Sequence, residues 1–298
     1  MDRQIRRVAV LGSGVMGSAI AAHFANAGIP SLVLDIVPAG AGDTPAARNA
    51  VAAGAVAAMK KTRPSPLFHI DRLALIETGN FEDDLPRIKD ADWVIEVVKE
   101  DLGIKKIVLE NAAPHMGPDA ILSSNTSGLS LTAMAAMLPA DLRPRFLGTH
   151  FFNPPRYMKL FELIPTDDTD PAITDFVAGF ASSRLGKGIV LAKDTPNFIA
   201  NRVGVHAMMA TVQVMDEMGL SIEEIDALTG PAIGRPRTAT FKLADLVGLD
   251  TFLHVADNLY PLIPDDEARD VFKAPDYLRQ MVDKGLLGRK SGGGFYRM

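Results

Sequence analysis

Short apolar runs alternate with helical patterns through the first two-thirds of the chain. The apolar runs predict strands, and the longer segments between them predict helices. Strands are predicted at residues 8–11, 32–35, 93–98, 120–124, 146–150 and 188–191, and helices at residues 15–28, 44–62 and 103–113. Because strand–helix alternation is typical of crossover connections, we expect an α/β fold with a doubly wound, mostly parallel sheet.

The pattern changes near residue 193. Thr195 followed by Pro196 predicts the N-cap and first position of a long helix that ends before Gly219. Residues 221–224 read Ser-Ile-Glu-Glu, a capping-box signature for the next helix, and no strand pattern follows before the short tail at residues 294–296. We therefore expect two domains, an α/β domain over residues 1–192 and a smaller all-helical domain over residues 193–298.

A glycine-rich motif joins the first predicted strand to the first predicted helix. It reads Gly12-Ser13-Gly14-Val15-Met16-Gly17. In this context the first glycine permits a tight turn, the second lets a pyrophosphate approach the backbone, and the third lets the helix pack closely on the strand. The helix N-terminus adds N–H donors and the positive end of a dipole. The motif predicts a Rossmann-type dinucleotide-binding domain, the alternative being an ordinary glycine-rich turn.

The cofactor type is indicated by the residue that ends the second predicted strand. A carboxylate at Asp35 accepts hydrogen bonds from both hydroxyls of a ribose and repels a 2′-phosphate. Ile36 and Val37 provide no arginine to bind such a phosphate. The sequence therefore favours NAD over NADP.

Two residues are candidates for proton transfer. His150 ends a predicted strand, just before Phe-Phe-Asn-Pro-Pro breaks the chain, and ligands of open parallel sheets gather at the carboxyl ends of strands. A histidine suits a general base near neutral pH, so His150 is the candidate base, the alternative being a core histidine. Glu162 lies among apolar residues and is the candidate partner of His150, if its strand runs beside that of His150. The alternative is an edge-strand glutamate that faces water.

Polar residues elsewhere are weaker candidates. Ser127 lies in a Ser-Ser-Asn-Thr-Ser-Gly segment after a predicted strand, where it is suited to hold a cofactor or a substrate oxygen or is simply a turn residue. Asn201 falls in the first turns of the helix expected from Pro196, with a solvated helical residue as the alternative.

Composition narrows the possible partners. The chain has 298 residues, a formal net charge of −5 and no cysteine. We expect no nucleic-acid partner because there is no basic field, no Cys-ligated metal, and indeed no metal site. There is no run of 18 apolar residues and no apolar leader before the first strand, so we expect no membrane partner and a cytoplasmic location.

Several of these segments together resemble the 3-hydroxyacyl-CoA dehydrogenase family. The similarity extends from Val8 to Tyr296, and its most specific stretches are residues 124–127, 148–154, 193–202 and 294–296. Similar segments also occur beside an enoyl-CoA hydratase-like region in longer multifunctional fatty-acid oxidation proteins, and the chain looks closest to that type. A stand-alone enzyme and a portion of a larger protein both remain open.

The resemblance implies specific roles for individual residues. It implies that His150 is the general base, that Glu162 is its partner, and that Ser127 and Asn201 bind the reacting oxygen of an (S)-3-hydroxyacyl-CoA thioester. It adds a set of NAD contacts beside the glycine-rich motif and Asp35: Glu100, Lys105, Ser127, Asn153 and Lys290. It also implies a homodimer formed through the helical domain, and a CoA site near residues 44–62, with Lys60, Lys61 or Arg63 as candidates for its phosphates, although a solvated basic helix end remains open there.

Two rival interpretations keep the same fold. Relatives of this family oxidise free hydroxy acids or sugar acids, and a requirement for the CoA moiety distinguishes those reactions from thioester oxidation. Dinucleotide-binding folds also serve as non-catalytic sensors or structural proteins. Such a protein needs no base, so the joint presence of four residues argues against this interpretation: His150, Glu162, Ser127 and Asn201.

Overall fold

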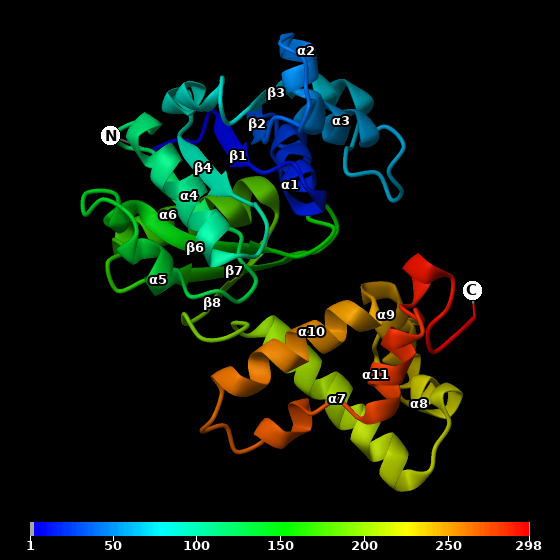
Figure 1. Cartoon of the computed structure of the whole chain (residues 1–298). Coiled ribbons are helices and arrows are strands. Elements are labelled where there is room, and N and C mark those ends of the chain that lie inside the picture. The colour runs from blue at the N-terminus through cyan, green and yellow to red at the C-terminus, as the bar shows by residue number, and fades with distance from the viewer. Residues whose placement is uncertain (1–2, 298) are drawn as a thin grey trace. The chain divides into compact units, whose positions relative to one another are not determined.

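Two compact units make up the computed structural model, which describes residues 3–297 (Figure 1). The first unit extends to Thr195 and the second begins at Pro196. Each unit has its own hydrophobic core.

The first unit contains one eight-stranded sheet in the order β3-β2-β1-β4-β5-β6-β7-β8. Neighbouring strands are parallel except for β6 and β7, which are antiparallel. The strands are β1 (Val8–Leu11), β2 (Ser31–Asp35), β3 (Ile76–Asn80), β4 (Trp93–Glu96), β5 (Ile121–Ser124), β6 (Phe146–Phe151), β7 (Leu160–Pro165) and β8 (Gly188–Leu191). The expected Rossmann-type, doubly wound, mostly parallel sheet is confirmed.

Helices cover both faces of this sheet. They are α1 (Val15–Asn26), α2 (Pro45–Arg48), α3 (Ala50–Ala58), α4 (Leu102–Ala112), α5 (Leu131–Ala136) and α6 (Pro171–Leu185), with short 3₁₀ helices at Ile70–Leu75, Leu85–Asp90, Ala113–His115 and Arg143–Arg145. On one face the rings of Phe24 from α1 and Phe180 from α6 contact Trp93 of β4. On the other face α5 approaches β6 so closely that a Cβ at Gly148 would lie 2.3 Å from a methyl carbon of Leu131.

The second unit is helical, as expected. Its helices are α7 (Ala200–Met218), α8 (Ile222–Thr229), α9 (Phe241–Val247), α10 (Leu249–Leu259) and α11 (Asp276–Asp283), with 3₁₀ helices at Pro231–Ile233, Tyr260–Leu262, Arg269–Phe272 and Arg289–Ser291. Its tail forms isolated bridges rather than a strand, and buried Asp245 accepts hydrogen bonds from the backbone N–H groups of Phe295 and Tyr296, both at 2.9 Å. The capping box at Ser221 and Glu224 is confirmed.

Two predicted helices were wrong in detail. The helix expected over residues 44–62 is broken at Asn49, whose side-chain oxygen accepts a hydrogen bond at 2.6 Å from Asn80 of β3. The helix expected from Pro196 starts only at Ala200, because Asn197 and Phe198 have φ angles of 59° and 49°, in the left-handed region that a right-handed helix excludes. Its predicted end is confirmed, with Gly219 in the left-handed conformation.

Candidate active site

The glycine-rich turn between β1 and α1 has the geometry of a phosphate cradle. Gly12 has φ of +109°, and a Cβ there would lie 2.7 Å from the Val97 carbonyl oxygen. A Cβ at Gly17 would lie 2.0 Å from the Gly12 carbonyl oxygen, so only glycine allows α1 to start this close to the turn. A Cβ at Gly14 would meet nothing within 4 Å. The turn is therefore closed on the protein side and open where a pyrophosphate would approach the start of α1.

Asp35 lies directly beside this turn. Its Oδ2 accepts hydrogen bonds from the backbone N–H and the hydroxyl of Ser13, both at 2.6 Å. A cavity of about 520 Å³ opens next to the carboxylate. It is lined by Gly12, Gly14, Asp35, Ile36, Phe81, Leu85, Val97, Val98, Lys99, Ile104, Ile107, Val108 and Asn111. Apolar walls with one carboxylate at the rim suit the adenosine half of NAD.

A second cavity of about 520 Å³ lies on the other side of the glycine-rich turn. It is lined by Ser13, Gly14, Val15, Ser18, Ala19, Ala55, Ala58, Met59, Thr62, Arg63, Pro64, Pro66, Asn153 and Pro154. Its walls thus come from the start of α1, from α3 with the residues after it, and from the connection between β6 and β7. Exposed Lys60 and Lys61 lie on the same segment as Arg63.

His150 and Glu162 face each other across β6 and β7. The antiparallel register pairs the two residues directly, and Nδ1 of His150 lies 2.7 Å from Oε2 of Glu162. Both are buried, with 5% and 0% of their surfaces exposed. An ionised Glu162 accepts the Nδ1 proton and so leaves Nε2 as the basic nitrogen of the neutral ring. This is the geometry of a base oriented by an acid.

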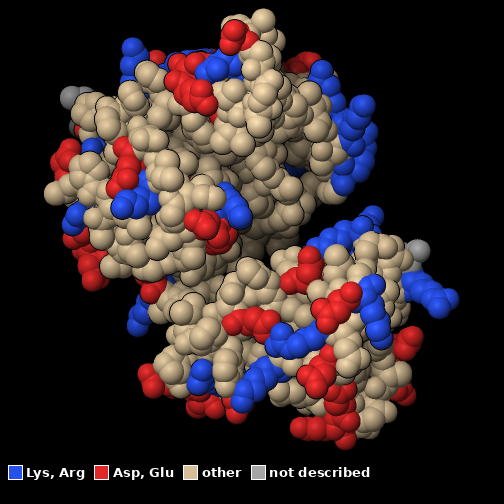
Figure 2. Space-filling view, in the orientation of Figure 1, with Lys and Arg blue, Asp and Glu red and all other residues tan. Residues whose placement is uncertain are grey.

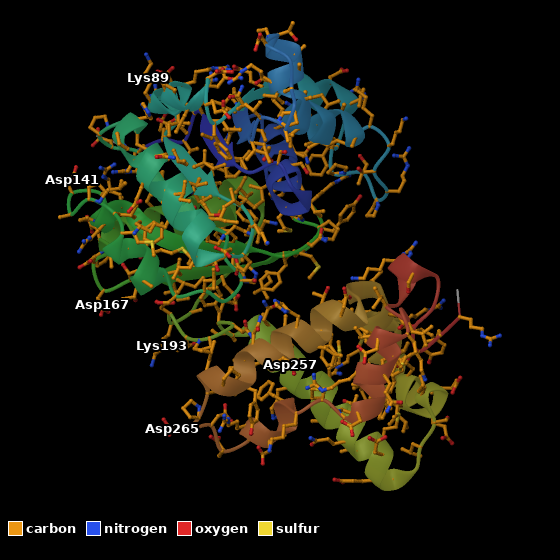
Figure 3. The ribbon with its side chains drawn as sticks, viewed as in Figure 1. Lys89, Asp141, Asp167, Lys193, Asp257 and Asp265 are labelled. Carbon is orange, nitrogen blue, oxygen red and sulfur yellow. The ribbon has the colours of Figure 1, made fainter. Side chains whose placement is uncertain are left out.

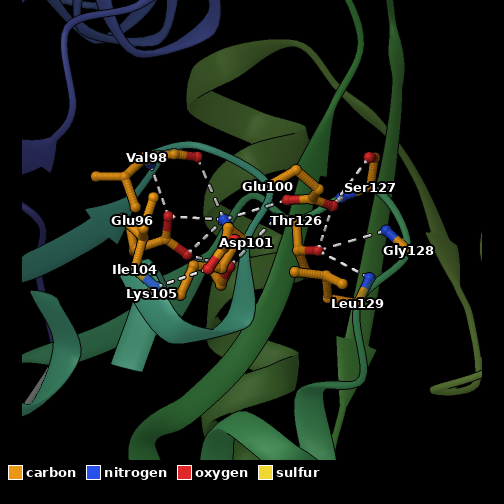
Figure 4. A network of polar contacts seen from close by, with 11 residues as sticks. Glu96, Val98, Glu100, Asp101, Ile104, Lys105, Thr126, Ser127, Gly128 and Leu129 are labelled. Carbon is orange, nitrogen blue, oxygen red and sulfur yellow. Dashed lines mark hydrogen bonds and ion pairs between the residues drawn. The ribbon is translucent and has the colours of Figure 1, made fainter. Parts of the chain in front are cut away.

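A buried ion pair lies at the carboxyl end of β4 (Figure 4). Lys105 of α4 is 1% exposed, and its Nζ donates to the two carboxylate oxygens of fully buried Glu96 at 2.8 and 3.0 Å. The same ammonium lies 3.2 Å from Oε2 of Glu100. Glu96 also accepts from the hydroxyl of Ser124. Lys105 therefore joins the ends of β4 and β5 to the start of α4.

Glu100 extends this network to Ser127. Its Oε1 accepts from the Thr126 hydroxyl at 2.6 Å, and from the backbone N–H and hydroxyl of Ser127 at 2.8 and 3.0 Å. Burial acts to raise the pKa of Glu100, but Lys105 and these donors outweigh it, so the pKa lies below its usual range. Glu100 is thus held as a carboxylate that fixes the loop carrying Ser127.

Two further residues support this loop, and neither was singled out from the sequence. Asp194 accepts hydrogen bonds from the backbone N–H groups of Leu131 and Thr132, at 3.0 and 2.8 Å, and so caps α5 from the segment after β8. The side-chain oxygen of Asn125 accepts from the backbone N–H of Phe151 at 2.9 Å, next to His150. Both lie in the stretches that carry the family resemblance, which was the available signal.

The remaining candidates are distributed over both units. Asn153 lines the second cavity in the first unit. Asn201 lies in the first turn of α7, and Lys290 forms an ion pair with Asp250 at 2.5 Å, both within the second unit. The first unit alone therefore brings together the glycine-rich turn with Asp35, the His150–Glu162 pair, and the Lys105–Glu100–Ser127 network.

Charged groups are otherwise spread over the surface. Figure 2 shows acidic and basic side chains interspersed on the visible face, and Figure 3 shows Lys89, Asp141 and Asp167 at the outside of the first unit. Within residues 3–297, no cluster of three histidine or acidic side chains is arranged to hold a metal ion. Over the same residues, no helix has the length and apolar character needed to cross a membrane.

The fold and the glycine-rich turn define a dinucleotide-binding protein, and comparison with known proteins specifies its family. Residues 7–195 match the model of the 3-hydroxyacyl-CoA dehydrogenase NAD binding domain, and residues 198–298 match that of the 3-hydroxyacyl-CoA dehydrogenase C-terminal domain. The chain belongs to the 3-hydroxyacyl-CoA dehydrogenase family. The first of these matches is to an NAD-binding domain, so the cofactor is NAD.

Individual relatives agree with this family. A probable 3-hydroxyacyl-CoA dehydrogenase of Bacillus subtilis is 48% identical over all of this chain, which spans 39% of that protein's length. A probable 3-hydroxyacyl-CoA dehydrogenase of Deinococcus radiodurans is 47% identical, over 99% of this chain and 83% of that protein. The crystal structure of (S)-3-hydroxybutyryl-CoA dehydrogenase from Ralstonia eutropha is similar with a TM-score of 0.78 and 32% identity, over 99% of each chain.

Proposed function

We propose that the chain oxidises (S)-3-hydroxyacyl-CoA to 3-oxoacyl-CoA in fatty-acid β-oxidation, with His150 as the general base and Glu162 as its partner. The observation that carries this proposal is the buried Nδ1–Oε2 hydrogen bond of 2.7 Å between them. A role in β-oxidation is supported by 39% identity to a putative fatty acid oxidation complex trifunctional enzyme of Rickettsia felis.

In this mechanism one residue accepts the proton and the other stabilises the cation that results. Neutral His150 takes the proton of the 3-hydroxyl at Nε2, and ionised Glu162 stabilises the imidazolium that forms. Burial of both groups strengthens their interaction because little water screens it. Glu162 keeps the ring in one orientation, so no reorientation is required when the proton moves.

NAD⁺ supplies the hydride acceptor when bound. We assign its pyrophosphate to the turn at Gly12, Gly14, Val15, Met16 and Gly17, and its ribose to Asp35. Glu100, Lys105, Ser127, Asn153 and Lys290 complete the proposed set of residues at the cofactor site. Since Lys105 is enclosed by Glu96 and Glu100, we expect it to act on the cofactor through Glu100 rather than by direct contact.

Ser127 and Asn201 are proposed to bind the reacting oxygen and thereby set the (S) stereochemistry. The hydroxyl of Ser127 donates to Glu100 in this structure, so Ser127 lies on the loop that this carboxylate fixes. Asn201 belongs to the second unit, and we propose that the helical domain expected at residues 193–298 acts as a closing domain. Closure of such a domain excludes water from a hydride-transfer site.

The CoA part of the substrate is assigned to the second cavity. Its wall carries Arg63, and exposed Lys60 and Lys61 precede it, which provides cations for the CoA phosphates. A cytoplasmic location and a homodimer built through the helical unit belong to the same proposal. Exposed apolar side chains of that unit, such as Val203, Met218 and Val247, support a protein interface there.

The reaction is tested by mixing the protein with NADH and acetoacetyl-CoA and following NADH absorbance. We expect rapid loss with this pair, and little or none when NADPH replaces NADH or free acetoacetate replaces the thioester. Activity on the free acid without the thioester would move the assignment to the hydroxy-acid relatives. Measurable NADH binding with no turnover of acetoacetyl-CoA or of a longer acyl thioester would contradict the proposed function.

A further inference from the structure

The connection between β6 and β7 carries an arginine that binds another part of the first unit. Nη1 of Arg156 donates to the backbone carbonyl oxygens of Ser65 and Leu67, at 2.8 and 2.6 Å. The hydroxyl of Tyr157 adds a donor to the Ser65 oxygen at 3.2 Å. These contacts join positions about ninety residues apart in the sequence. A charged donor shared by two carbonyls is stronger than neutral hydrogen bonds of the same length.

Aromatic rings enclose the same guanidinium. Its central carbon lies 4.6 Å from the ring centre of Phe68 and 5.0 Å from that of Tyr157. Phe68 is 63% exposed, so the stacked arginine covers part of an otherwise solvated ring. Planar stacking on these rings is available to arginine and not to lysine, whereas two hydrogen bonds from one nitrogen are available to both.

The segment that Arg156 holds is the return end of the arm formed by residues 44–68. Its backbone is also fixed to α1, because the side chain of Asn26 donates to the Pro66 oxygen at 2.9 Å and accepts from the Phe68 N–H at 2.8 Å. Pro66 lines the second cavity, as does Asn153 on the connection that carries Arg156. Arg156 therefore ties together two walls of that cavity.

The connection itself is anchored from the other side. Nζ of buried Lys187, at the start of β8, donates to the carbonyl oxygens of Pro155 and Met158. These two acceptors flank Arg156 in the sequence. Because Lys187 holds its backbone, the connection is a fixed support from which Arg156 positions the arm.

We infer that Arg156 is a positioning residue that locks the return end of the arm against the β6–β7 connection and so sets the affinity for the CoA end of the substrate. It contributes to ground-state binding of the nucleotide part of CoA and not to proton or hydride transfer. This inference rests on the proposed function for its CoA assignment. The contact of Arg156 with the return end of the arm can be tested without the CoA assignment.

The test compares two thioesters in the NADH assay, acetoacetyl-CoA and S-acetoacetylpantetheine, which lacks the nucleotide of CoA. In Arg156→Met we expect the KM for acetoacetyl-CoA to rise about tenfold, with kcat and the KM for NADH within about twofold of wild type. Turnover of the pantetheine thioester should stay unchanged. Arg156→Lys should restore part of the loss, since it keeps the charge without the planar fork. Arg184→Met, at an exposed arginine of α6, is the matched control.

Amide hydrogen exchange of residues 59–68 provides the second readout. We expect faster exchange there in Arg156→Met than in wild type or in Arg184→Met. Unchanged exchange would overturn the inference, because Arg156 would then have no effect on the arm. An equal loss of activity on both thioesters would overturn it as well, because Arg156 would then act through the strand that carries His150. If wild type has the same KM for both thioesters, the nucleotide of CoA does not bind at the arm, and Arg156 does not set the affinity for it. If wild type turns over neither thioester, the proposed function fails, and the exchange result still decides whether Arg156 locks the arm.

Discussion

At the scale of single residues, the glycine-rich turn and the pair of His150 and Glu162 were the easiest features to find in the sequence. The motif from Gly12 to Gly17 is local, and its three glycines each meet a steric or approach requirement that the structure makes explicit. Glu162 was recognisable because a carboxylate amid apolar residues needs a buried partner. Arg156 was missed because its partners are backbone carbonyls distant in sequence, which leave no signal in residue types.

The turn supplies a test with a matched control. In Gly17→Ala the new Cβ would lie 2.0 Å from the Gly12 carbonyl oxygen, so the turn must shift away from the geometry to which we assign the NAD pyrophosphate. We expect the Kd for NADH to rise by at least about tenfold, a cost of roughly 1.4 kcal/mol, when measured by fluorescence titration. Gly179→Ala in α6 adds a Cβ that meets nothing within 4 Å and should leave the Kd unchanged. Equal NADH affinity in both variants would show that the turn does not bind the cofactor.

At the scale of elements, six of the eight strands were predicted, with small differences at their ends. The segment of β7 was considered only as a condition for pairing Glu162 with His150, and β3 at the sheet edge was missed because its side chains alternate poorly between apolar and polar. The broken helix at Asn49 and the delayed start of α7 share one cause. Tertiary contacts and left-handed backbone override local helix signals there, and neither is visible in a residue pattern.

The junction of α6 and β8 predicts a pH dependence of stability. Burial lowers the pKa of Lys187 to about 8, from 10.5 in an exposed lysine. Between these pH values the unfolded chain holds a proton that the folded chain has lost, so the free energy of unfolding rises with pH in that window and is flat below it. Relative to Lys187→Met, wild type should gain up to about 3 kcal/mol between pH 8 and 10.5.

Urea denaturation at pH 7.5 and pH 10 measures this difference. Lys89→Met, at an exposed lysine, serves as the control and should follow wild type at both pH values. If the stability of wild type relative to Lys187→Met does not rise over this range, burial does not lower the pKa of Lys187 in the folded protein.

At the scale of the whole molecule, the fold class and the family could be inferred from the order of motifs along the chain. Oligomeric state, cellular location and the CoA contacts remain proposals, because they depend on surfaces whose partners leave no pattern in one sequence. The Bacillus subtilis relative is much longer, since this chain spans 39% of it.

We propose that His150 is the base and that Glu162 only orients and stabilises it. The most direct measurement compares kcat with acetoacetyl-CoA and NADH for wild type, His150→Ala and Glu162→Gln, with NADH affinity measured in parallel. We expect His150→Ala to lower kcat by about 10²- to 10⁴-fold, Glu162→Gln to lower it by less, and both to bind NADH as wild type does. Near-normal turnover in His150→Ala, or a larger loss in Glu162→Gln than in His150→Ala, would contradict the claim.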